Sequence, residues 1–254
     1  GPEEGDMACG EWGLGRMSEP VHIVAALENF FRRGLALDGT RSLVTSGPTF
    51  EAIDPVRYLA NRSSGKQGHA IAAALAGLGS ATTLVSGPTH QPDPAGVEVI
   101  RVESAVQMLD ACAQALPADV AVLAAAVTDW RPDHAAGGKI KKPPGGQPPG
   151  LALVENPDIL AHLSALGNAR PRLVVGFAAE TDDIVENATA KRTRKGCDWI
   201  VANDVAPETG TFAGDSNTVH LITEDGVEDW PRLTKTAVAG RLADRIAETL
   251  AATA

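Results

Sequence analysis

The segment at residues 61–68, NRSSGKQG, combines small hydroxyl residues, glycines and a lysine, the residue types that often hold a phosphate group. Ser63, Ser64 and Gly65 come directly before a predicted helix that starts near Lys66. The free N–H groups and the positive dipole end of such a helix attract anions. The alternative is that Ser63 or Ser64 simply caps the helix, because serine favours that position. The segment by itself leaves both interpretations open.

The usual phosphate motifs do not explain this segment. A P-loop requires G-x-x-x-x-G-K-[S/T], but Gln67 follows Lys66 and Ala60 stands at the first glycine position. The dinucleotide fingerprint G-x-G-x-x-G is missing after the first predicted strand, where the sequence reads SGPTFE. The histidines and cysteines lack zinc spacing, and no G-x-S-x-G nucleophile elbow occurs. Any anion site must therefore be built from less common parts.

Charge and composition narrow the class of ligand. The 254-residue chain has a net charge of −10, which argues against a general nucleic-acid binder because phosphate neutralisation needs a positive face. The lysines and arginines are nevertheless grouped, at Lys139, Lys141 and Lys142 and again within 191–195, KRTRK. Such groups indicate either a small polyanionic ligand or an ordinary solvated face.

The sequence also predicts the cellular compartment of the protein. No apolar run reaches the roughly 18 to 20 residues that span a bilayer. The three cysteines, Cys9, Cys112 and Cys197, are odd in number and far apart, which fits a reducing compartment. We expect a cytoplasmic protein with no membrane and no nucleic-acid partner.

Apolar strands and helices alternate from residue 41 onward. Strands are predicted at 42–47, 81–87, 97–102, 119–127, 172–178 and 198–204, and helices at 66–78, 103–116, 157–166, 183–195 and 233–252. The strands are apolar throughout, which is typical of a parallel sheet covered on both faces. The fold class we predict is α/β, with a doubly wound, mostly parallel Rossmann-like sheet and helices on both faces. A small β-hairpin at 211–230 and an extended Pro/Gly-rich arm at 131–150 complete it.

The first 40 residues follow a different pattern. MACGEWGLGRMSEP is rich in Gly and Met and shows no strand pattern. An amphipathic helix is predicted next, with Ser18 as its cap, Pro20 in its first turn and a stop at Gly34. Its apolar face would consist of Ile23, Leu27, Phe30 and Phe31.

Seven ordered segments identify a family. They read TSGPTFEAIDPVRYLANRSSGKQG, LVSGPT, AAAVTDWRP, KIKK, ENPDIL, VGFAAET and VANDV, and most of them follow predicted strands, where doubly wound sheets bind ligands. Over residues 41 to 250 this series closely resembles phosphopantothenate–cysteine ligase, the CTP-dependent enzyme of coenzyme A biosynthesis. The leader, MACGEWGLGRMSEPVHIV, resembles the tail of the FMN-dependent phosphopantothenoylcysteine decarboxylase that bacteria commonly fuse ahead of this ligase.

The double resemblance implies a fragment of a bifunctional protein. Residues 1–40 would be the residual decarboxylase tail and linker, and residues 41–254 the ligase domain. FMN would bind only in the missing decarboxylase domain, and the full-length chain would also decarboxylate the ligase product. Cys9 would be the proton donor of the decarboxylase, but the rest of that active site would be missing from this fragment.

The resemblance further implies the reaction and the assembly. The carboxylate of 4′-phosphopantothenate attacks the α-phosphorus of CTP, and the resulting acyl-cytidylate then reacts with the amine of cysteine. Mg²⁺ would be held mainly by phosphates and water, with no protein metal site. A homodimer would form through the ligase domain, with the arm at 138–154 covering the partner's site, and the full-length fusion would form a higher oligomer.

The family's functional residues map onto matching positions in this chain. Asn61 and Lys139 are the expected catalytic residues, acting on the acyl-cytidylate and on the triphosphate respectively. Phosphopantothenate would be held by Asn61, Ser63, Ser64 and Gly65. The expected nucleotide-binding residues are Leu123, Ala124, Ala125, Asp129, Lys139, Asn156, Pro157, Asp158, Ile159, Phe177, Lys191 and Lys195. From the sequence we also expect Asn156 to cap a helix that has Pro157 in its first position.

Two other readings remain. A nicotinamide-dependent Rossmann reductase shares the architecture, but the glycine fingerprint and a Tyr-x-x-x-Lys pair are missing from the sequence. A catalytically silent nucleotide-binding or assembly module would bind CTP without releasing pyrophosphate.

Overall fold

The computed structural model describes residues 3–6, 11–24, 27, 35–142, 150–204, 214 and 216–252. The chain divides into two compact units, Gly1–Ala36 and Leu37–Ala254, whereas the sequence predicts this boundary at residue 40. Among the described residues, no helix combines the length and the apolar character that a membrane crossing requires.

The first unit contains a hairpin that the sequence did not indicate. Strand β1 (Glu3–Asp6) pairs antiparallel with β2 (Trp12–Arg16), and Gly5 lies opposite Gly13. A Cβ at Gly5 would lie 2.8 Å from Arg16 Cδ, so glycine leaves room for that side chain. The expectation of no strand was wrong because glycine-rich strands lack the apolar alternation that marks a strand in sequence. A helix begins at Pro20, which the sequence predicted to lie in the first turn, while Cys9, Phe30, Phe31 and Gly34 lie outside the described residues.

An eight-stranded sheet forms the centre of the second unit, in the order β14-β13-β12-β11-β8-β3-β6-β7. Its strands are β3 (Arg41–Ser46), β6 (Ala81–Ser86), β7 (Val97–Arg101), β8 (Val120–Leu123), β11 (Leu173–Glu180), β12 (Trp199–Asp204), β13 (Ser216–Ile222) and β14 (Val227–Thr234). Six neighbouring strands of this sheet, β12, β11, β8, β3, β6 and β7, are parallel. The β13–β14 hairpin continues the sheet antiparallel to β12. The mostly parallel sheet and the hairpin are confirmed.

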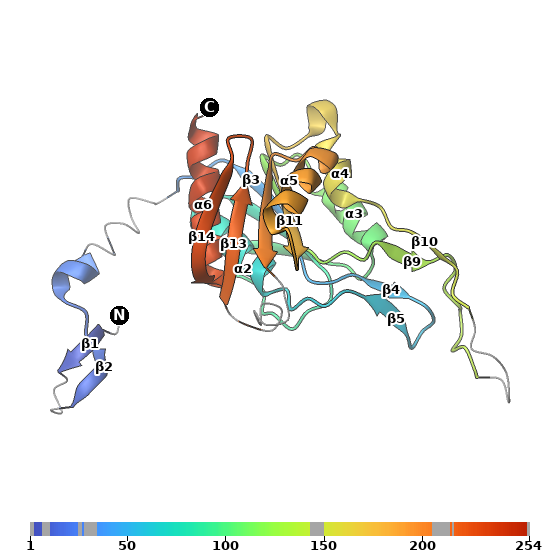
Figure 1. Cartoon of the computed structure of the whole chain (residues 1–254), viewed down its shortest axis with the longest axis horizontal. Helices are drawn as coiled ribbons and strands as arrows, with labels where there is room; N and C mark the ends of the chain where they lie inside the picture. Colours follow the sequence, from blue (N-terminus) through green and yellow to red (C-terminus); the bar gives the residue numbers. More distant parts are fainter. Residues whose placement is uncertain are drawn as a thin grey trace. The chain divides into compact units, whose positions relative to one another are not determined.

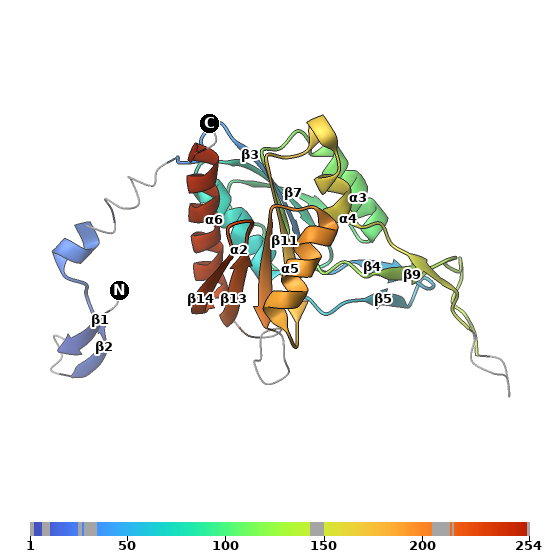
Figure 2. The ribbon, with the colours of Figure 1, turned by 45° about the horizontal axis from the view of Figure 1, so that its top comes forward.

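Helices cover both faces of this sheet (Figures 1 and 2). On one face lie α2 (Lys66–Gly77) and α6 (Lys235–Ala252), and on the other α3 (Ala105–Gln114), α4 (Ile159–Ser164) and α5 (Ile184–Lys195), with a 3₁₀ turn, η1, at Gly167–Ala169. Two apolar cores result, because successive strand residues point to opposite faces. Val44, Val122 and Val175 pack in the core under α2 and α6. Their neighbours Leu43, Ala121 and Val174 pack in the core under α3, α4 and α5.

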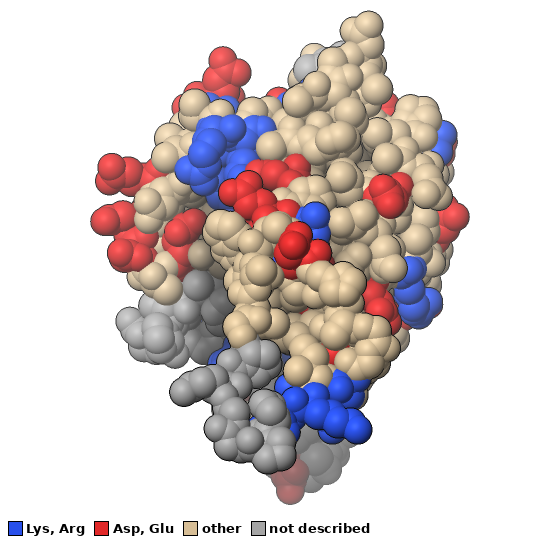
Figure 3. Space-filling model, turned by 90° about the vertical axis from the view of Figure 1, so that its right-hand side faces the viewer, with Lys and Arg blue, Asp and Glu red and all other residues tan. Residues whose placement is uncertain are grey.

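Two small antiparallel pairs extend away from the sheet (Figures 1 and 2). One is the β4 (Phe50–Ala52) and β5 (Tyr58–Ala60) hairpin, which the sequence analysis did not predict, and the other joins β9 (Trp130–Pro132) to β10 (Leu153–Glu155). The second pair forms the two sides of the predicted arm. Figure 3 shows this side of the molecule, where most of the surface carries neither acidic nor basic side chains.

Asp54, which is 3% exposed, fastens the arm to the β4–β5 turn. Its carboxylate accepts from the N–H groups of Val56 and Ile140 at 2.8 and 3.1 Å and from Arg57 Nε at 3.0 Å. Arg57 in turn donates to the carbonyl of Ile140 at 2.9 Å. The Arg57 guanidinium and these N–H groups hold the pKa of Asp54 well below its usual range despite its burial.

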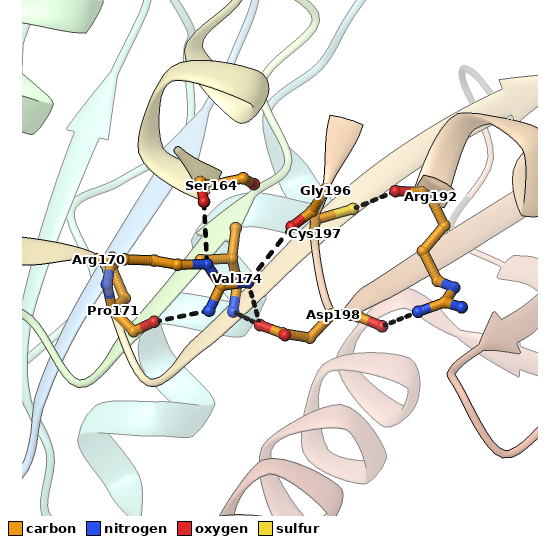
Figure 4. Close-up of polar contacts among 8 residues, drawn as sticks. All are labelled: Ser164, Arg170, Pro171, Val174, Arg192, Gly196, Cys197 and Asp198. Carbon is orange, nitrogen blue, oxygen red and sulfur yellow. Dashed lines mark hydrogen bonds and ion pairs between the residues drawn. The ribbon is translucent and has the colours of Figure 1, made fainter. Parts of the chain in front are cut away.

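A second polar cluster, shown in Figure 4, fixes α5 at the amino edge of the sheet. Arg170 donates to Asp198 Oδ2 at 2.8 Å and to the carbonyls of Ser164 and Pro171 at 3.1 and 3.0 Å. Asp198 also accepts from the N–H of Val174 at 2.7 Å. The end of α4 and the strands β11 and β12 are thereby tied together where α5 ends at Gly196.

Candidate active site

A cleft of about 900 Å³ lies at the carboxyl edge of the sheet. It is lined by the ends of β8, β11 and β12 and by the starts of α2, α4 and α6. The structure brings fifteen of the predicted site residues into this lining: Asn61, Ser63, Ser64, Gly65, Leu123, Ala124, Ala125, Asp129, Asn156, Pro157, Asp158, Ile159, Phe177, Lys191 and Lys195. Residues from five separate segments therefore share one hollow, as expected for the edge of a doubly wound sheet.

Two predicted residues are not in this lining. Lys139 precedes Ile140 on the arm, where Asp54 and Arg57 fasten the backbone, and it does not line the cleft of its own chain. Cys9 lies outside the described residues.

The start of α2 opens into the cleft through a tight turn. The N-cap is Gly65, with φ 73°, and no side chain caps this helix, so the serine-cap alternative was wrong. Ser63 Oγ instead accepts from the N–H of Gly65 at 3.3 Å. A Cβ at Gly65 would lie 2.8 Å from Thr89 Oγ1, and one at Gly68 would lie 2.5 Å from Ser46 Cβ. This close approach requires glycine at both positions, and the positive φ of Gly65 is a second reason at that position.

A buried triangle of polar groups supports the turn. Ser46 Oγ donates to the Gly65 carbonyl at 2.9 Å, and His69 Nδ1 lies 2.9 Å from Ser46 Oγ and 3.0 Å from the same carbonyl. Burial lowers the pKa of His69, although the Gly65 carbonyl favours its charged form. The neutral imidazole thus helps to fix the turn that presents the helix start.

Two asparagines hold the backbone that follows β8. Asn61 Nδ2 donates to the Val127 carbonyl at 2.9 Å, and Asn156 Nδ2 donates to the Thr128 carbonyl at 2.8 Å. The N–H of Asn156 donates to the next carbonyl, that of Asp129, at 2.8 Å. Three consecutive carbonyl groups are therefore fixed, which positions the small residues at the strand end.

The start of α4 corrects one expectation. The helix begins at Ile159, and its N-cap is Asp158, whose carboxylate accepts from the N–H of Ala161 at 3.0 Å. Asn156 does not cap this helix, because its side chain donates hydrogen bonds to the carbonyl and the hydroxyl of Thr128 instead. Pro157 consequently lies outside the helix rather than in its first position.

Two lysines of α5 reach the same wall of the cleft. Lys195 forms an ion pair with Asp158, and Lys191 Nζ donates to the Phe177 carbonyl at 2.9 Å. Burial raises the pKa of Asp158, but the Ala161 N–H and Lys195 outweigh this effect and the pKa is lower than usual. Burial lowers the pKa of Lys191, partly offset by Glu180. Lys191 is four residues from Lys195, so both ammonium groups lie on one helix face.

Several cleft residues were not assigned from the sequence. Among them are Gln67, Gly68, Thr128, Trp130, Glu155, Asn203, Asn217 and Lys235. The sequence predicts site residues at the ends of parallel strands, whereas β13 and α6 begin at the same edge of the sheet because β13 runs antiparallel. The same expectation, applied to the starts of β13 and α6, would have identified Asn217 and Lys235. In the part of the chain that the structure describes, no group of three or more His, Cys, Asp or Glu side chains could hold a metal ion.

The cleft therefore has two sides suited to anions. One carries Lys191 and Lys195, and the other is the start of α2, whose N-cap is a glycine without a capping side chain. The strand end at 123–129, with its small side chains and fixed carbonyls, lies in the same lining.

Solved structures share this fold. The crystal structure of the C-terminal domain of the coenzyme A biosynthesis bifunctional protein CoaBC is 39% identical, with a TM-score of 0.72, and the match covers 85% of this chain and 98% of that one. A Cab2 mutant in complex with phosphopantothenate-cysteine, 16% identical with a TM-score of 0.66, shows the same fold over 93% of this chain and 96% of its own.

Curated relatives carry the same bifunctional name. The coenzyme A biosynthesis bifunctional protein CoaBC of Vibrio cholerae is 45% identical over 249 residues, and that of Escherichia coli is 43% identical over 248 residues. These matches cover 98% and 97% of this chain but only 62% and 61% of the relatives, so the chain spans about three fifths of their length.

The family of the chain follows from a match over most of its length. Residues 37–250, which contain the whole sheet and the cleft, match the family described as the DNA/pantothenate metabolism flavoprotein C-terminal domain. The chain belongs to this family.

Proposed function

We propose that this chain ligates 4′-phosphopantothenate to L-cysteine at the expense of CTP, in coenzyme A biosynthesis. The observation that carries the proposal is the cleft itself, whose lining contains the lysine pair Lys191 and Lys195, the start of α2 and the end of β8. Such a cleft can hold a nucleotide triphosphate and a second anion close together, which the first half-reaction requires. The similarity to CoaBC proteins supports the same activity.

The nucleotide would bind on the side of α4 and α5. Lys195 would exchange its ion pair with Asp158 for phosphate oxygens of CTP, while Lys191 remains beside the Phe177 carbonyl. The small residues Ala124 and Ala125 leave room for the base to reach backbone groups. Binding CTP would thus need only a local rearrangement of one lysine.

The acyl substrate would bind on the side of Asn61 and the α2 start. Its carboxylate oxygen attacks the α-phosphorus of CTP, the bond to the β-phosphate oxygen breaks, and pyrophosphate leaves. The amine of cysteine then attacks the acyl carbon, CMP leaves with the carboxylate oxygen, and the amine loses a proton. The Asn61 carboxamide, which donates to the Val127 carbonyl, would contact the acyl group in the second step.

Mg²⁺ would assist by neutralising the triphosphate. The carboxylates of Asp129 and Glu155 line the cleft and are oxygen ligands of the kind this ion prefers. They would contact the ion or its water shell, while the phosphates supply most of its ligands.

We also propose a homodimer in which Lys139 serves the partner's cleft. The arm that carries it is fastened to the β4–β5 turn, outside the cleft of its own chain. Large apolar side chains are exposed on these projections, namely Val56, Tyr58, Trp130, Leu151 and Leu153. A second subunit covering them would bury this surface and bring Lys139 to a triphosphate.

The remaining proposals concern the longer protein. Residues 1–40 would be the end of a decarboxylase domain that binds FMN and uses Cys9 as a proton donor. The full-length protein would then decarboxylate the ligase product and form a higher oligomer in the cytoplasm.

The direct test measures pyrophosphate and CMP separately. Pyrophosphate release from CTP should require phosphopantothenate, and CMP should be released only after cysteine is added. A silent nucleotide-binding module would bind CTP and release neither product, which would refute the proposal.

A further inference from the structure

Three carboxamide oxygens in the cleft lack a hydrogen-bond partner. Among the residues that the structure describes, five buried side-chain polar atoms are unpaired, and Gln67 Oε1, Asn203 Oδ1 and Asn217 Oδ1 are three of them. All three residues line the cleft, and Asn217 is only 2% exposed. A buried polar atom without a partner destabilises the fold, so a cluster of them beside a cleft indicates a ligand that satisfies them.

The topology brings these carboxamides together. Asn203 is the second-last residue of β12, and Asn217 is the second residue of the antiparallel neighbour β13. Both therefore lie at the edge of the sheet where the parallel strands end. Asn203 lies two residues after Val201 on β12, so both residues are on the same face of the sheet. This is the face whose core lies under α2 and α6. Gln67 Nε2 donates to the Lys235 carbonyl at 3.1 Å, which joins the starts of these two helices.

The same place has a positive electrostatic environment. The helices α2 and α6 contain 12 and 18 residues, and both begin at the cleft edge with their dipoles directed toward it. Lys66 and Lys235 are the first residues of the two helices, and both line the cleft. At the start of α6 the Ala237 N–H already donates to Thr234 Oγ1 at 3.1 Å, and at the start of α2 the Lys66 N–H lies 3.5 Å from Ser64 Oγ. The place therefore offers positive charge and the other N–H groups of the two helix starts together with carboxamides.

We infer that Gln67, Asn203, Asn217 and Lys235 form a subsite for the phosphate monoester end of the acyl substrate, which rests on the function proposed above. The phosphate oxygens would accept from the helix starts and from Asn NH₂ groups, which can exchange with the oxygens by a half-turn of χ2. Gln67 Oε1 must accept, because its nitrogen already donates to Lys235. Phosphopantothenate supplies such a donor in the hydroxyl of its pantoyl group, whereas the triphosphate end of CTP has none.

The subsite fixes the direction in which the substrate lies. The phosphate would bind between the starts of α2 and α6, and the carboxylate would lie near Asn61 and the strand end that carries the nucleotide. Discrimination between phosphopantothenate and pantothenate would then depend on residues distant from the reacting atoms.

The test compares wild type with Asn217→Asp, and Asn168→Asp on η1 is the matched control because Asn168 is exposed and outside the cleft. In Asn217→Asp the new carboxylate should repel the phosphate. We expect kcat/KM for phosphopantothenate to fall at least 100-fold and the preference over pantothenate at least 10-fold, with KM for CTP within threefold. Calorimetry without CTP should show the same loss of phosphopantothenate affinity.

The outcomes separate this inference from the proposed function. If wild type does not turn over phosphopantothenate with CTP, the proposed function fails before any variant is compared. If wild type is active and Asn217→Asp keeps its preference for the phosphorylated substrate, or weakens CTP instead, the subsite is wrong. If Asn217→Asp does not fold, Gln67→Leu decides the question, with at least a 10-fold higher KM for phosphopantothenate expected and an unchanged KM overturning the inference.

Discussion

Asn61 and Asn156 donate to the carbonyl groups of two consecutive residues, Val127 at 2.9 Å and Thr128 at 2.8 Å. The two asparagines come from segments almost a hundred residues apart, and they fix the backbone between the acyl side and the nucleotide side of the cleft. A change in either side chain should therefore affect the relative placement of the two substrates.

The first prediction concerns Asn61→Asp. Aspartate cannot donate to the Val127 carbonyl, and its carboxylate would face that oxygen and repel the negative charge that develops in the acyl group. We expect the rate of CMP release with cysteine to fall at least 100-fold, and pyrophosphate release to fall much less. Rapid-quench measurements of both products would show this. Equal loss of the two steps, or loss of neither, would contradict the role given to Asn61.

The second prediction concerns Lys195→Met. A charge-assisted contact to phosphate contributes about 1.5–3 kcal/mol, so the affinity for CTP should fall roughly 10- to 100-fold. Arg194→Met on the same helix is the control, because Arg194 is exposed and outside the cleft lining. Equilibrium binding of CTP measures the difference. Equal affinities of the two variants would show that Lys195 stays with Asp158 and does not bind the nucleotide.

The third prediction tests the packing at the start of α2. In Gly68→Ala the new Cβ would lie 2.5 Å from Ser46 Cβ and 3.0 Å from Ser46 Cα, so the variant should lose about 1–3 kcal/mol of unfolding free energy. Gly240→Ala in α6 is the control, since its Cβ would have no neighbour within 4 Å and should stabilise the helix by about 0.5–1 kcal/mol. Urea unfolding compares the two. If both variants gain stability, the close contact with Ser46 is not limiting.

The fourth prediction is a pH dependence caused by His69. Its pKa in the folded protein lies below the ordinary value of 6.5, so the unfolded chain binds the proton first as the pH falls. The stability that depends on neutral His69 is complete above pH 6.5 and is lost as the pH falls from there to the folded pKa. Chemical unfolding at several pH values below 7.5 should give a shallower loss for His69→Gln than for wild type. Parallel curves would show that His69 titrates normally.

Much of the fold could be predicted from the sequence because it depends on local composition. The uniformly apolar strands, such as 120–123, indicate a sheet covered on both faces. Ligands bind where such strands end, which places Asn61 and Asp129 near one another, whereas Lys191 was assigned only through the family resemblance. The β1–β2 and β4–β5 hairpins could not be predicted in the same way. Their stability comes from backbone pairing and local contacts, such as the stacking of Phe50 on Tyr58, rather than from an apolar pattern.

The detail of the site depends on which of several equivalent groups makes each contact. Asn156 and Asp158 are both good helix caps in sequence, and only the fold shows that Asn156 is used on Thr128 while Asp158 caps α4. Asn217 and Lys235 were missed because an antiparallel hairpin returns the chain to the edge where the parallel strands end. Such long-range choices cannot be read from spacing.

The most direct measurement of the central claim is to mix the protein with CTP and phosphopantothenate in the absence of cysteine and to identify the bound product by mass spectrometry. The account predicts one phosphopantothenoyl-cytidylate per cleft and an equal amount of pyrophosphate, with CMP appearing when cysteine is added. Formation of CDP with an acyl phosphate, or pyrophosphate release that does not require phosphopantothenate, would contradict it.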